Sequence, residues 1–349
     1  MPLTRRKYLG ALGVSALAGC TGTGPTAEAS SGSTEVSLLL NWKPNGLHVP
    51  YYTAKARRYY EEAGLSVSSI DPGEGSEFSA KQAGLGNNAF AISSSDQVLN
   101  INSRDLSPLA VGVVMQKSPV VVFTTPETFG EEFTSVDQLA GKQVGTGPGM
   151  VRIMTELLLE RHGLLSEVEL VDTGFDTVQQ LLTGKVDAAG GVFGDAIAAR
   201  AQGNTVQSIP VAETVDSYGH VITTNREFAR SNPDAVRSFL EATARGAAWA
   251  QQNPDQGVDH LVDANQVLGE SRDQQLENWE TMASQFMLSQ TVEETGWGWS
   301  RPNPWETAAT ALADAGLLGG EVDPATVWTN EYLDTDAEYI GSYTDVISE

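Results

Sequence analysis

Alternating strand-like and helix-like segments constrain the fold of this chain more than any other feature of its sequence. The apolar run Val36 to Leu40 favours a strand, the pattern from Pro50 to Ala63 favours a helix, and Leu65 to Ile70 again favours a strand. Pro50 suits the first turn of a helix, and Gly64 suits the position just after its end. This order predicts βαβ units and therefore an α/β fold.

A second series of the same kind begins in the middle of the chain. After the β-branched run Val111 to Thr125, the loop Pro126 to Thr134 leads to new helix and strand patterns, and Val221 to Asn225 favours a later strand. We predict two α/β lobes, one formed by residues 35–125 and 216–349 and the other by residues 126–215. The chain then crosses twice between the lobes, which predicts a hinge and a ligand cleft between them.

The N-terminal segment has the pattern of an export signal. Paired arginines lie between Thr4 and Leu9, an apolar run continues to Ala18, and Leu17 to Cys20 matches a lipobox. Residues 1–20 therefore predict a twin-arginine lipoprotein signal, with lipid attached to Cys20 and the protein held at the outer face of the cell membrane. Residues 21–34 are rich in small residues and predict a flexible tether. Because Cys20 is the only cysteine, no disulfide framework is expected.

Charge excludes one class of partner. The chain has 45 acidic and 21 basic residues and a net charge of −24, which disfavours binding to nucleic acid. The acidic residues are scattered rather than grouped, so we interpret them as a solvated surface, and adaptation to high salt is the simplest hypothesis for their number.

One segment carries a family resemblance. The stretch from Leu39 to Lys55, with Asn41-Trp42-Lys43-Pro44-Asn45 at its start, resembles the opening of binding proteins for thiamine-pyrimidine precursors. Further similarity lies at 136–149, 181–191 and 329–333, so the resemblance spans nearly the whole mature chain. It implies a type II periplasmic binding protein with two lobes, which serves an ABC permease and its ATPase. Relatives in the superfamily take up riboflavin, nitrate or alkanesulfonates.

The resembled family also includes a pyrimidine synthase, which makes the same heterocycle from pyridoxal phosphate and a histidine with iron and depends on a cysteine-rich motif. This sequence lacks that motif, since its only cysteine is Cys20. Nucleophile-elbow, zinc-protease, P-loop and dinucleotide motifs are also absent. We therefore predict a binding protein without catalytic residues, cofactor or metal, and expect it to be a monomer.

Residues that follow the first predicted strand are the leading ligand candidates. Trp42 can stack on a flat ring, with core packing as the alternative, and Asn41 lies beside it. His48 and Tyr51 or Tyr52 stand near the next helix start and add a polar edge and an aromatic wall. Because two adjacent tyrosines cannot share one helix face, at least one of them is expected to pack in the core.

Other candidates lie at later strand-to-helix turns and at the return crossing. Ser94 and Ser95 suit a polar ligand edge or an ordinary helix cap, and Asp195 suits an exocyclic amine or a helix cap. Glycines before the helix at Met150 allow close approach of a ligand to the backbone. The remaining predicted ligand-binding residues are Gly147, Gly149, Phe193, Tyr218 and Trp297.

Together these observations predict a reversible binding protein. The ligand is expected to bridge both lobes and to shift a hinge equilibrium toward the closed form. We rank a thiamine-precursor aminopyrimidine first, another flat heterocycle such as a flavin second, and an oxyanion such as nitrate or an alkanesulfonate third. A structural or sensory lipoprotein and a synthase-like enzyme are the competing classes.

Overall fold

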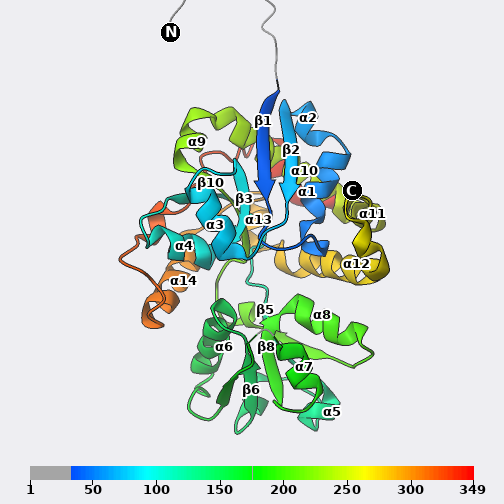
Figure 1. Ribbon diagram of the computed structural model, residues 1–349, viewed down its shortest axis with the longest axis vertical. Coiled ribbons are helices and arrows are strands. Elements are labelled where there is room, and N and C mark those ends of the chain that lie inside the picture. Colours follow the sequence, from blue (N-terminus) through cyan, green and yellow to red (C-terminus); the bar gives the residue numbers. More distant parts are fainter. Residues whose placement is uncertain (1–32, 175) are drawn as a thin grey trace, which may run out of the picture. The chain divides into compact units, whose positions relative to one another are not determined.

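The structure is a computed structural model that describes residues 33–174 and 176–349 (Figure 1). The predicted export signal, Cys20 and nearly all of the predicted tether lie outside the described residues. Two five-stranded mixed sheets, each with helices packed against it, form the described part. The predicted α/β class is therefore confirmed.

The first sheet has the strand order β2-β1-β3-β10-β4. Strands β1, β2 and β3 are parallel, whereas β10 is antiparallel to both of its neighbours, β3 and β4. The start of β10 therefore lies at the edge of the sheet where β1 and β3 end. The strands are β1 (Thr34–Leu39), β2 (Leu65–Asp71), β3 (Phe90–Ser94), β4 (Pro108–Val113) and β10 (His220–Asn225).

The second sheet has the order β7-β6-β8-β5-β9, in which β5 is antiparallel to both of its neighbours. Strand β6 pairs in parallel with β7 and β8. The strands are β5 (Val120–Thr124), β6 (Gln143–Thr146), β7 (Glu169–Asp172), β8 (Ala188–Val192) and β9 (Gln207–Pro210). We call the first sheet and its helices the first lobe, and the second sheet and its helices the second lobe.

The two passages between the sheets lie side by side. The outgoing passage runs between β4 and β5, and the returning passage precedes β10. The Gly219 amide donates to the Met115 carbonyl at 3.0 Å, and the Val114 and Met115 amides both donate to the His220 carbonyl. A β-carbon on Gly219 would lie 2.8 Å from the ring of Pro119, so only glycine fits at this contact.

The predicted boundary at residues 125 and 126 is displaced from the observed passage. The run Val111 to Thr125 forms parts of two strands in different sheets, because β4 ends before a short polar interruption and β5 begins after it. Ser118-Pro119 marks that interruption in the sequence. A continuous run of β-branched residues in the sequence predicts a buried strand, but it does not predict which sheet that strand joins.

The first predicted helix is also divided. In place of one helix from Pro50 to Ala63, the chain forms α1 (Val49–Ala56) and α2 (Tyr59–Glu62). Arg58 lies between them in the left-handed region with φ of 64°, which interrupts the hydrogen-bond ladder. Gly64 has φ of 79°, as expected for a glycine that ends a helix.

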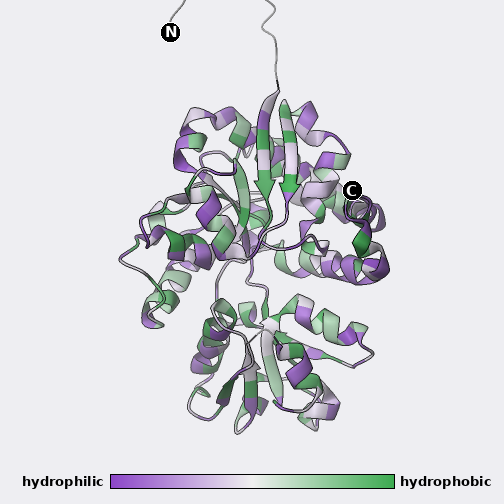
Figure 2. Cartoon of the chain, in the orientation of Figure 1, coloured by the Kyte–Doolittle hydropathy of each residue, from purple (hydrophilic) through white to green (hydrophobic). Residues whose placement is uncertain are grey.

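The remaining helices cover the two sheets, and Figure 2 shows hydrophobic residues along much of β1 and β3 and both hydrophobic and hydrophilic residues on the helices around them. Phe90 of β3 stacks on Phe239 of α10 at 3.9 Å between ring centroids. The other helices are α3 (Ser76–Gly84), α4 (Ser95–Asn102), α5 (Pro126–Phe129), α6 (Met150–Arg161), α7 (Thr177–Leu182), α8 (Phe193–Ala201), α9 (Arg226–Ser231), α10 (Pro233–Gln252), α11 (Pro254–Ala264), α12 (Arg272–Thr281), α13 (Gln290–Glu294), α14 (Pro302–Asp314), α15 (Glu338–Gly341) and α16 (Tyr343–Ser348). A π-helical segment, η5 (Met282–Phe286), extends α12.

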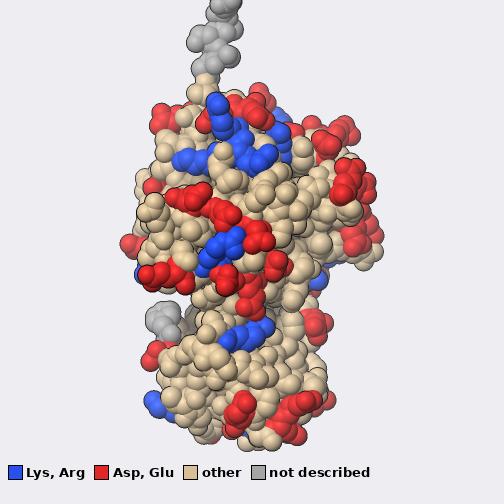
Figure 3. Space-filling view, turned by 90° about the vertical axis from the view of Figure 1, so that its right-hand side faces the viewer, with Lys and Arg blue, Asp and Glu red and all other residues tan. Residues whose placement is uncertain are grey.

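Acidic side chains are spread over the face shown in Figure 3, with fewer basic side chains among them. Some are paired: Arg272 contacts Asp259 at 2.8 Å and Asp255 at 3.1 Å on the surface. Exposed ion pairs of this kind contribute little to stability and are screened by salt. Adaptation to high salt stays a prediction.

Candidate ligand-binding site

Three polar side chains from separate segments form a hydrogen-bonded chain at one edge of the first sheet. Asn41 follows β1, His48 ends the short helix η1 (Gly46–His48), and His220 begins β10. His220 lies opposite Ser94, the last residue of β3. The segments meet there because antiparallel β10 starts where the parallel strands β1 and β3 end. We call His48, Asn41 and His220 the histidine–asparagine chain.

The hydrogen bonds fix the direction of donation along this chain. The Asn45 amide donates to His48 Nδ1 at 3.2 Å, so the proton of this imidazole lies on Nε2. His48 Nε2 donates to Asn41 Oδ1 at 2.8 Å. Asn41 Nδ2 in turn donates to His220 Nε2 at 2.9 Å. Each imidazole therefore uses one unprotonated nitrogen as an acceptor.

Both imidazoles are neutral at ordinary pH. Burial lowers the pKa of His48 to about 3, with His220 nearby as a second cause. Burial also lowers the pKa of His220 to about 4. The two rings are nearly parallel, with 6.4 Å between their centroids. A proton on either ring would remove an acceptor from the histidine–asparagine chain and would place a charge on a buried group.

Trp42 is exposed, and its backbone is held in place beside the histidine–asparagine chain. Its side chain is 51% exposed, and it is the only aromatic among the exposed large hydrophobic side chains of the described residues. The Gly73 amide donates to the Trp42 carbonyl at 3.1 Å, and the Gly75 amide donates to the Asn41 carbonyl at 2.8 Å. Core packing, the alternative considered for Trp42, does not account for an indole that is half in solvent.

Helix α12 holds the segment that carries His48. The Gly46 amide donates to Gln275 Oε1 at 2.9 Å inside the protein. Asn278, one turn further along α12, is 8% exposed, and its Oδ1 has no hydrogen-bond partner among the described residues. Gln275 and Asn278 were not predicted from the sequence. A buried amide oxygen without a partner is costly, which makes Asn278 an additional candidate for ligand contact.

Gly46→Ala is expected to destabilise the protein by about 1–3 kcal/mol, the usual cost of overpacking. A β-carbon at this position would lie 2.3 Å from the Gln275 carbonyl oxygen and 3.1 Å from the Trp279 amide nitrogen, and backbone atoms cannot yield easily. Thermal unfolding followed by circular dichroism measures the effect. Gly269→Ala is the matched control, because its nearest contact is a Val262 methyl at 3.8 Å. Equal stability of the two variants would contradict the expected clash.

The start of α8 brings two predicted residues of the second lobe toward α12 and η5. The ring of Phe193 stacks on that of Phe286 with centroids 4.6 Å apart. Asp195 Oδ2 accepts a hydrogen bond from the Val192 amide at 2.9 Å, and burial raises the pKa of the Asp195 carboxyl. A β-carbon on Gly194 would lie 3.4 Å from Asn278 Oδ1. Asp195 therefore caps α8, and its other oxygen stays available for a ligand.

Ser94 and Ser95 differ in their contacts. Ser94 caps α4 without a side-chain hydrogen bond to a backbone amide of the helix, whereas Ser95 Oγ donates to the Tyr218 carbonyl at 2.9 Å. Ser95 therefore ties α4 to the returning passage. The neighbouring Asp96 is 4% exposed, and burial raises its pKa, although hydrogen bonds from Ser94 and Gln97 oppose the shift.

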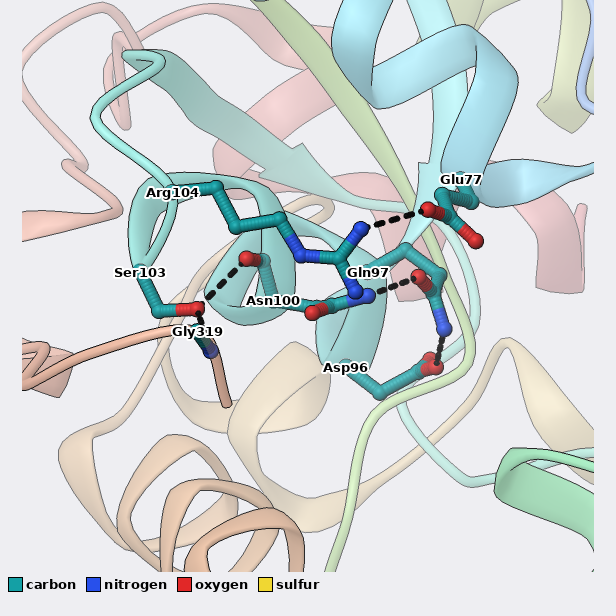
Figure 4. A network of polar contacts seen from close by, with 7 residues as sticks. All are labelled: Glu77, Asp96, Gln97, Asn100, Ser103, Arg104 and Gly319. Atoms are coloured by element: carbon teal, nitrogen blue, oxygen red, sulfur yellow. Dashed lines mark hydrogen bonds and ion pairs between the residues drawn. The ribbon is translucent and has the colours of Figure 1, made fainter. Parts of the chain in front are cut away.

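A row of polar residues continues from Asp96 along α4 (Figure 4). Gln97 Nε2 donates to Asp96 Oδ2 at 2.7 Å, and Asn100 Nδ2 donates to Gln97 Oε1 at 3.0 Å. Ser103 Oγ donates to the Asn100 carbonyl and accepts from the Gly319 amide. These contacts occupy the side chains of Gln97 and Ser103, whereas Asn100 Oδ1 is buried without a hydrogen-bond partner among the described residues.

Several predicted residues have contacts that explain them by packing or by turns. Tyr51 and Trp297 are each 1% exposed, although the Tyr51 hydroxyl and Trp297 Nε1 have no hydrogen-bond partner among the described residues. Tyr218 accepts a hydrogen bond from the Arg301 amide at 2.7 Å through its hydroxyl oxygen. Gly147 follows β6, where a β-carbon would lie 2.8 Å from the Gly174 carbonyl oxygen, and Gly149 has φ of 78° before α6. Of these five residues, Tyr51 contacts the histidine–asparagine chain, because its ring centroid lies 6.4 Å from that of His48.

Two surface pockets lie away from these residues. One of about 730 Å³ is lined by α14 and the segment that follows it, and one of about 490 Å³ lies between α1 and α11. Within residues 33–174 and 176–349, no three histidine, cysteine, aspartate or glutamate side chains form a group that could hold a metal ion. The candidate site is thus defined by exposed Trp42 and the polar side chains around it.

Comparisons with known proteins give a family. A family model described as NMT1/THI5 like matches residues 45–257. The riboflavin-binding protein RibY of Chloroflexus aurantiacus is 25% identical over 88% of this chain and 89% of its own length. The formylaminopyrimidine-binding protein of Halalkalibacterium halodurans is 26% identical over 68% of this chain and 72% of its own. A 4-amino-5-hydroxymethyl-2-methylpyrimidine phosphate synthase of Aspergillus parasiticus is 21% identical over 67% and 72%.

Solved structures give the fold. The periplasmic aliphatic sulphonate-binding protein SsuA of Escherichia coli superposes with a TM-score of 0.67 at 14% identity, over 84% of this chain and 91% of its own. The periplasmic nitrate-binding protein NrtA of Synechocystis superposes with a TM-score of 0.62 at 10% identity, over 90% and 91%. These likenesses confirm the predicted two-lobed fold of periplasmic binding proteins.

Proposed function

Because the chain belongs to the NMT1/THI5-like family, we propose that it is the solute-binding component of an ABC importer and that it captures a small heteroaromatic compound outside the cytoplasm. A thiamine-precursor aminopyrimidine is the leading ligand. The observation that carries this proposal is the half-exposed indole of Trp42 beside an asparagine amide that two neutral imidazoles hold in place.

Each candidate side chain has a distinct role in this proposal. Trp42 stacks on the flat ring, which contributes about 0.5–1.5 kcal/mol beyond the area that it buries. Asn41 pairs with a polar edge of the ring through the amide atoms that remain free. The second carboxylate oxygen of Asp195 accepts a hydrogen bond from an exocyclic amine. Asn278, whose amide oxygen is buried without a partner, gives a further acceptor between Gly46 and Gly194.

Capture is proposed to work by a hinge. The two passages between the sheets are short and hydrogen-bonded to each other, so they permit a bend while they keep the lobes in register. A ligand that contacts Trp42 and Asn41 on the first lobe and Asp195 on the second stabilises the closed form, because only that form offers both sets of contacts. The closed form then docks on the permease.

The proposed location follows from the N-terminal segment. The twin-arginine motif and Cys20 support export and a lipid anchor. The similarity to binding proteins supports a permease and its ATPase as partners, and a monomer stays a prediction. Among the helices that the structure describes, none has both the length and the apolar content needed to cross a membrane.

Two alternatives have specific support. A flavin is favoured by the similarity to RibY, which extends over a larger share of this chain than the similarity to the formylaminopyrimidine-binding protein. Synthase chemistry is suggested by the similarity to the fungal synthases. The synthases depend on a cysteine-rich motif, however, and Cys20 is the only cysteine here. Among the candidate ligands, an oxyanion such as nitrate or an alkanesulfonate ranks third, after the aminopyrimidine and the flavin.

Mass spectrometry of the small molecules released from gently purified protein tests the proposal. We expect an aminopyrimidine, recovered chemically unchanged after incubation with the protein. Titration calorimetry with 4-amino-5-hydroxymethyl-2-methylpyrimidine, riboflavin, an alkanesulfonate and nitrate then ranks the ligands. Tight binding of riboflavin alone would replace the leading ligand, and conversion of the bound compound would refute a binding function.

A further inference from the structure

We propose that His48 and His220 are positioning residues that fix the orientation of the Asn41 amide and thereby determine which heterocycle the site accepts. This inference rests on the proposed function and deepens it. The selected ligand edge has an amine next to an unprotonated ring nitrogen, as in a 4-aminopyrimidine. The rejected edge has the reverse arrangement, a carbonyl next to a ring N–H, as in a 4-pyrimidinone.

The first step is an inventory of the Asn41 amide. Its oxygen can accept two hydrogen bonds, and its nitrogen can donate two. His48 Nε2 uses one acceptor position of Oδ1, and His220 Nε2 uses one proton of Nδ2. One acceptor position and one N–H therefore remain. This pair matches the amine and the ring nitrogen of an aminopyrimidine, in the same way that asparagine reads the amine and ring nitrogen of adenine.

The second step concerns rotation of the amide. If the oxygen and nitrogen of Asn41 changed places, Nδ2 would face the N–H of His48, which is a contact between two donors. The proton cannot move to the other nitrogen of His48 without loss of the bond from the Asn45 amide to Nδ1. Oδ1 would face Nε2 of His220, and this contact becomes a hydrogen bond only if the proton of His220 moves from Nδ1 to Nε2. The observed orientation is therefore strongly preferred.

The third step concerns burial. His48 has no exposed surface and His220 is 7% exposed, so water does not compensate for a lost hydrogen bond at either ring. Burial also keeps both rings uncharged, because it lowers the pKa of each histidine well below neutrality. The two rings come from η1 and from β10, which are fixed independently by α12 and by the first sheet. The amide is therefore held from both sides by rigid parts of the first lobe.

Discrimination between two pyrimidines tests the proposal. Titration calorimetry gives the Kd of 4-amino-5-hydroxymethyl-2-methylpyrimidine and of its 4-oxo counterpart for the wild-type protein, His48→Ala and His220→Ala. We expect the wild-type protein to bind the 4-amino compound at least about tenfold more tightly than the 4-oxo compound. A difference of about 1.4 kcal/mol in binding free energy gives that ratio of Kd values. In His48→Ala this ratio should fall toward one, because the amide can then rotate, whereas in His220→Ala it should fall less, because the protonated Nε2 of His48 still opposes rotation.

Two further variants separate positioning from general damage. Trp42→Ala should weaken both pyrimidines by a similar factor and keep their ratio. His162→Ala changes an exposed histidine near Asp137 and should alter neither affinity. An unchanged ratio in folded His48→Ala overturns the inference while leaving the proposed function intact. Failure of the wild-type protein to bind either pyrimidine overturns the proposed ligand and the inference with it.

A spectroscopic test needs no ligand and no histidine variant. Nitrogen-15 spectra of the histidine side chains at neutral pH should show two neutral buried rings, one of which carries its proton on Nε2. Assignment of that ring to His48 supports the chain of hydrogen bonds. A charged ring at either position, or a proton on Nδ1 of His48, overturns the inference even if His48→Ala and His220→Ala fail to fold.

Discussion

Trp42→Ala is expected to weaken aminopyrimidine binding by about 10- to 100-fold, which corresponds to about 1–3 kcal/mol from lost stacking and lost apolar contact. The stability of the free protein should hardly change, because the indole is half exposed and makes few core contacts. Titration calorimetry measures the affinity, and thermal unfolding without ligand measures the stability. Leu85→Ala is the control, because it removes another half-exposed apolar side chain at the end of α3, outside the proposed site. It should change neither the affinity nor the stability.

The same prediction extends to the second lobe through Asp195→Ala, which should also weaken aminopyrimidine binding. This variant removes a cap from α8 as well, since Asp195 Oδ2 accepts from the Val192 amide. Asp195→Asn keeps an acceptor for that cap and removes the charge, so it separates the ligand contact from the loss of the cap. Unchanged affinity in both Trp42→Ala and Asp195→Ala would discredit the proposed site.

Acidification from pH 7 to pH 4 is expected to reduce the free energy of unfolding by several kcal/mol through His48 and His220. An unfolded histidine has a pKa of 6.5, whereas burial lowers the pKa of His48 to about 3 and of His220 to about 4. Between these values the unfolded chain binds protons that the folded protein excludes, so stability is full above pH 6.5 and falls as the pH approaches the folded pKa values. His220 alone accounts for about 3 kcal/mol at 1.36 kcal/mol for each pKa unit.

Urea unfolding at a series of pH values measures this effect. Replacement of both histidines by glutamine should flatten the stability curve between pH 6.5 and pH 4. Burial raises the pKa of Asp96 and Asp195, so protonation of these carboxyls stabilises the folded state and has the opposite sign. An equally steep fall in the double variant would show that other groups cause the acid sensitivity.

The sequence predicted the class of fold because local patterns and turn residues agree with the final structure. Glycine after α2 and proline at the start of α10 each lie where their conformational preferences place them. The split of the run Val111 to Thr125 was missed, because strand exchange between sheets depends on long-range pairing. The break at Arg58 was missed as well, since nothing in an arginine favours the left-handed region.

The candidate site was predictable only where its residues are close in sequence. Asn41, Trp42 and His48 come from one short segment, and their pattern drew attention to it. His220 is 179 residues from Asn41, and no spacing rule connects them. Its position directly after Gly219 at the return crossing was the available signal. Gln275, Asn278 and Phe286 lie on a helix with an ordinary polar pattern, which gave no indication of their contacts.

His220 accepts two separate sets of hydrogen bonds, one through its carbonyl oxygen and one through its ring. Its carbonyl oxygen accepts hydrogen bonds from the Val114 and Met115 amides of the outgoing passage, and its ring accepts from Asn41. In the proposed hinge mechanism, a bend of the passages that shifts this backbone also shifts the ring, and with it the Asn41 amide. Under that proposal, opening of the lobes and release of the ligand are coupled through a single residue.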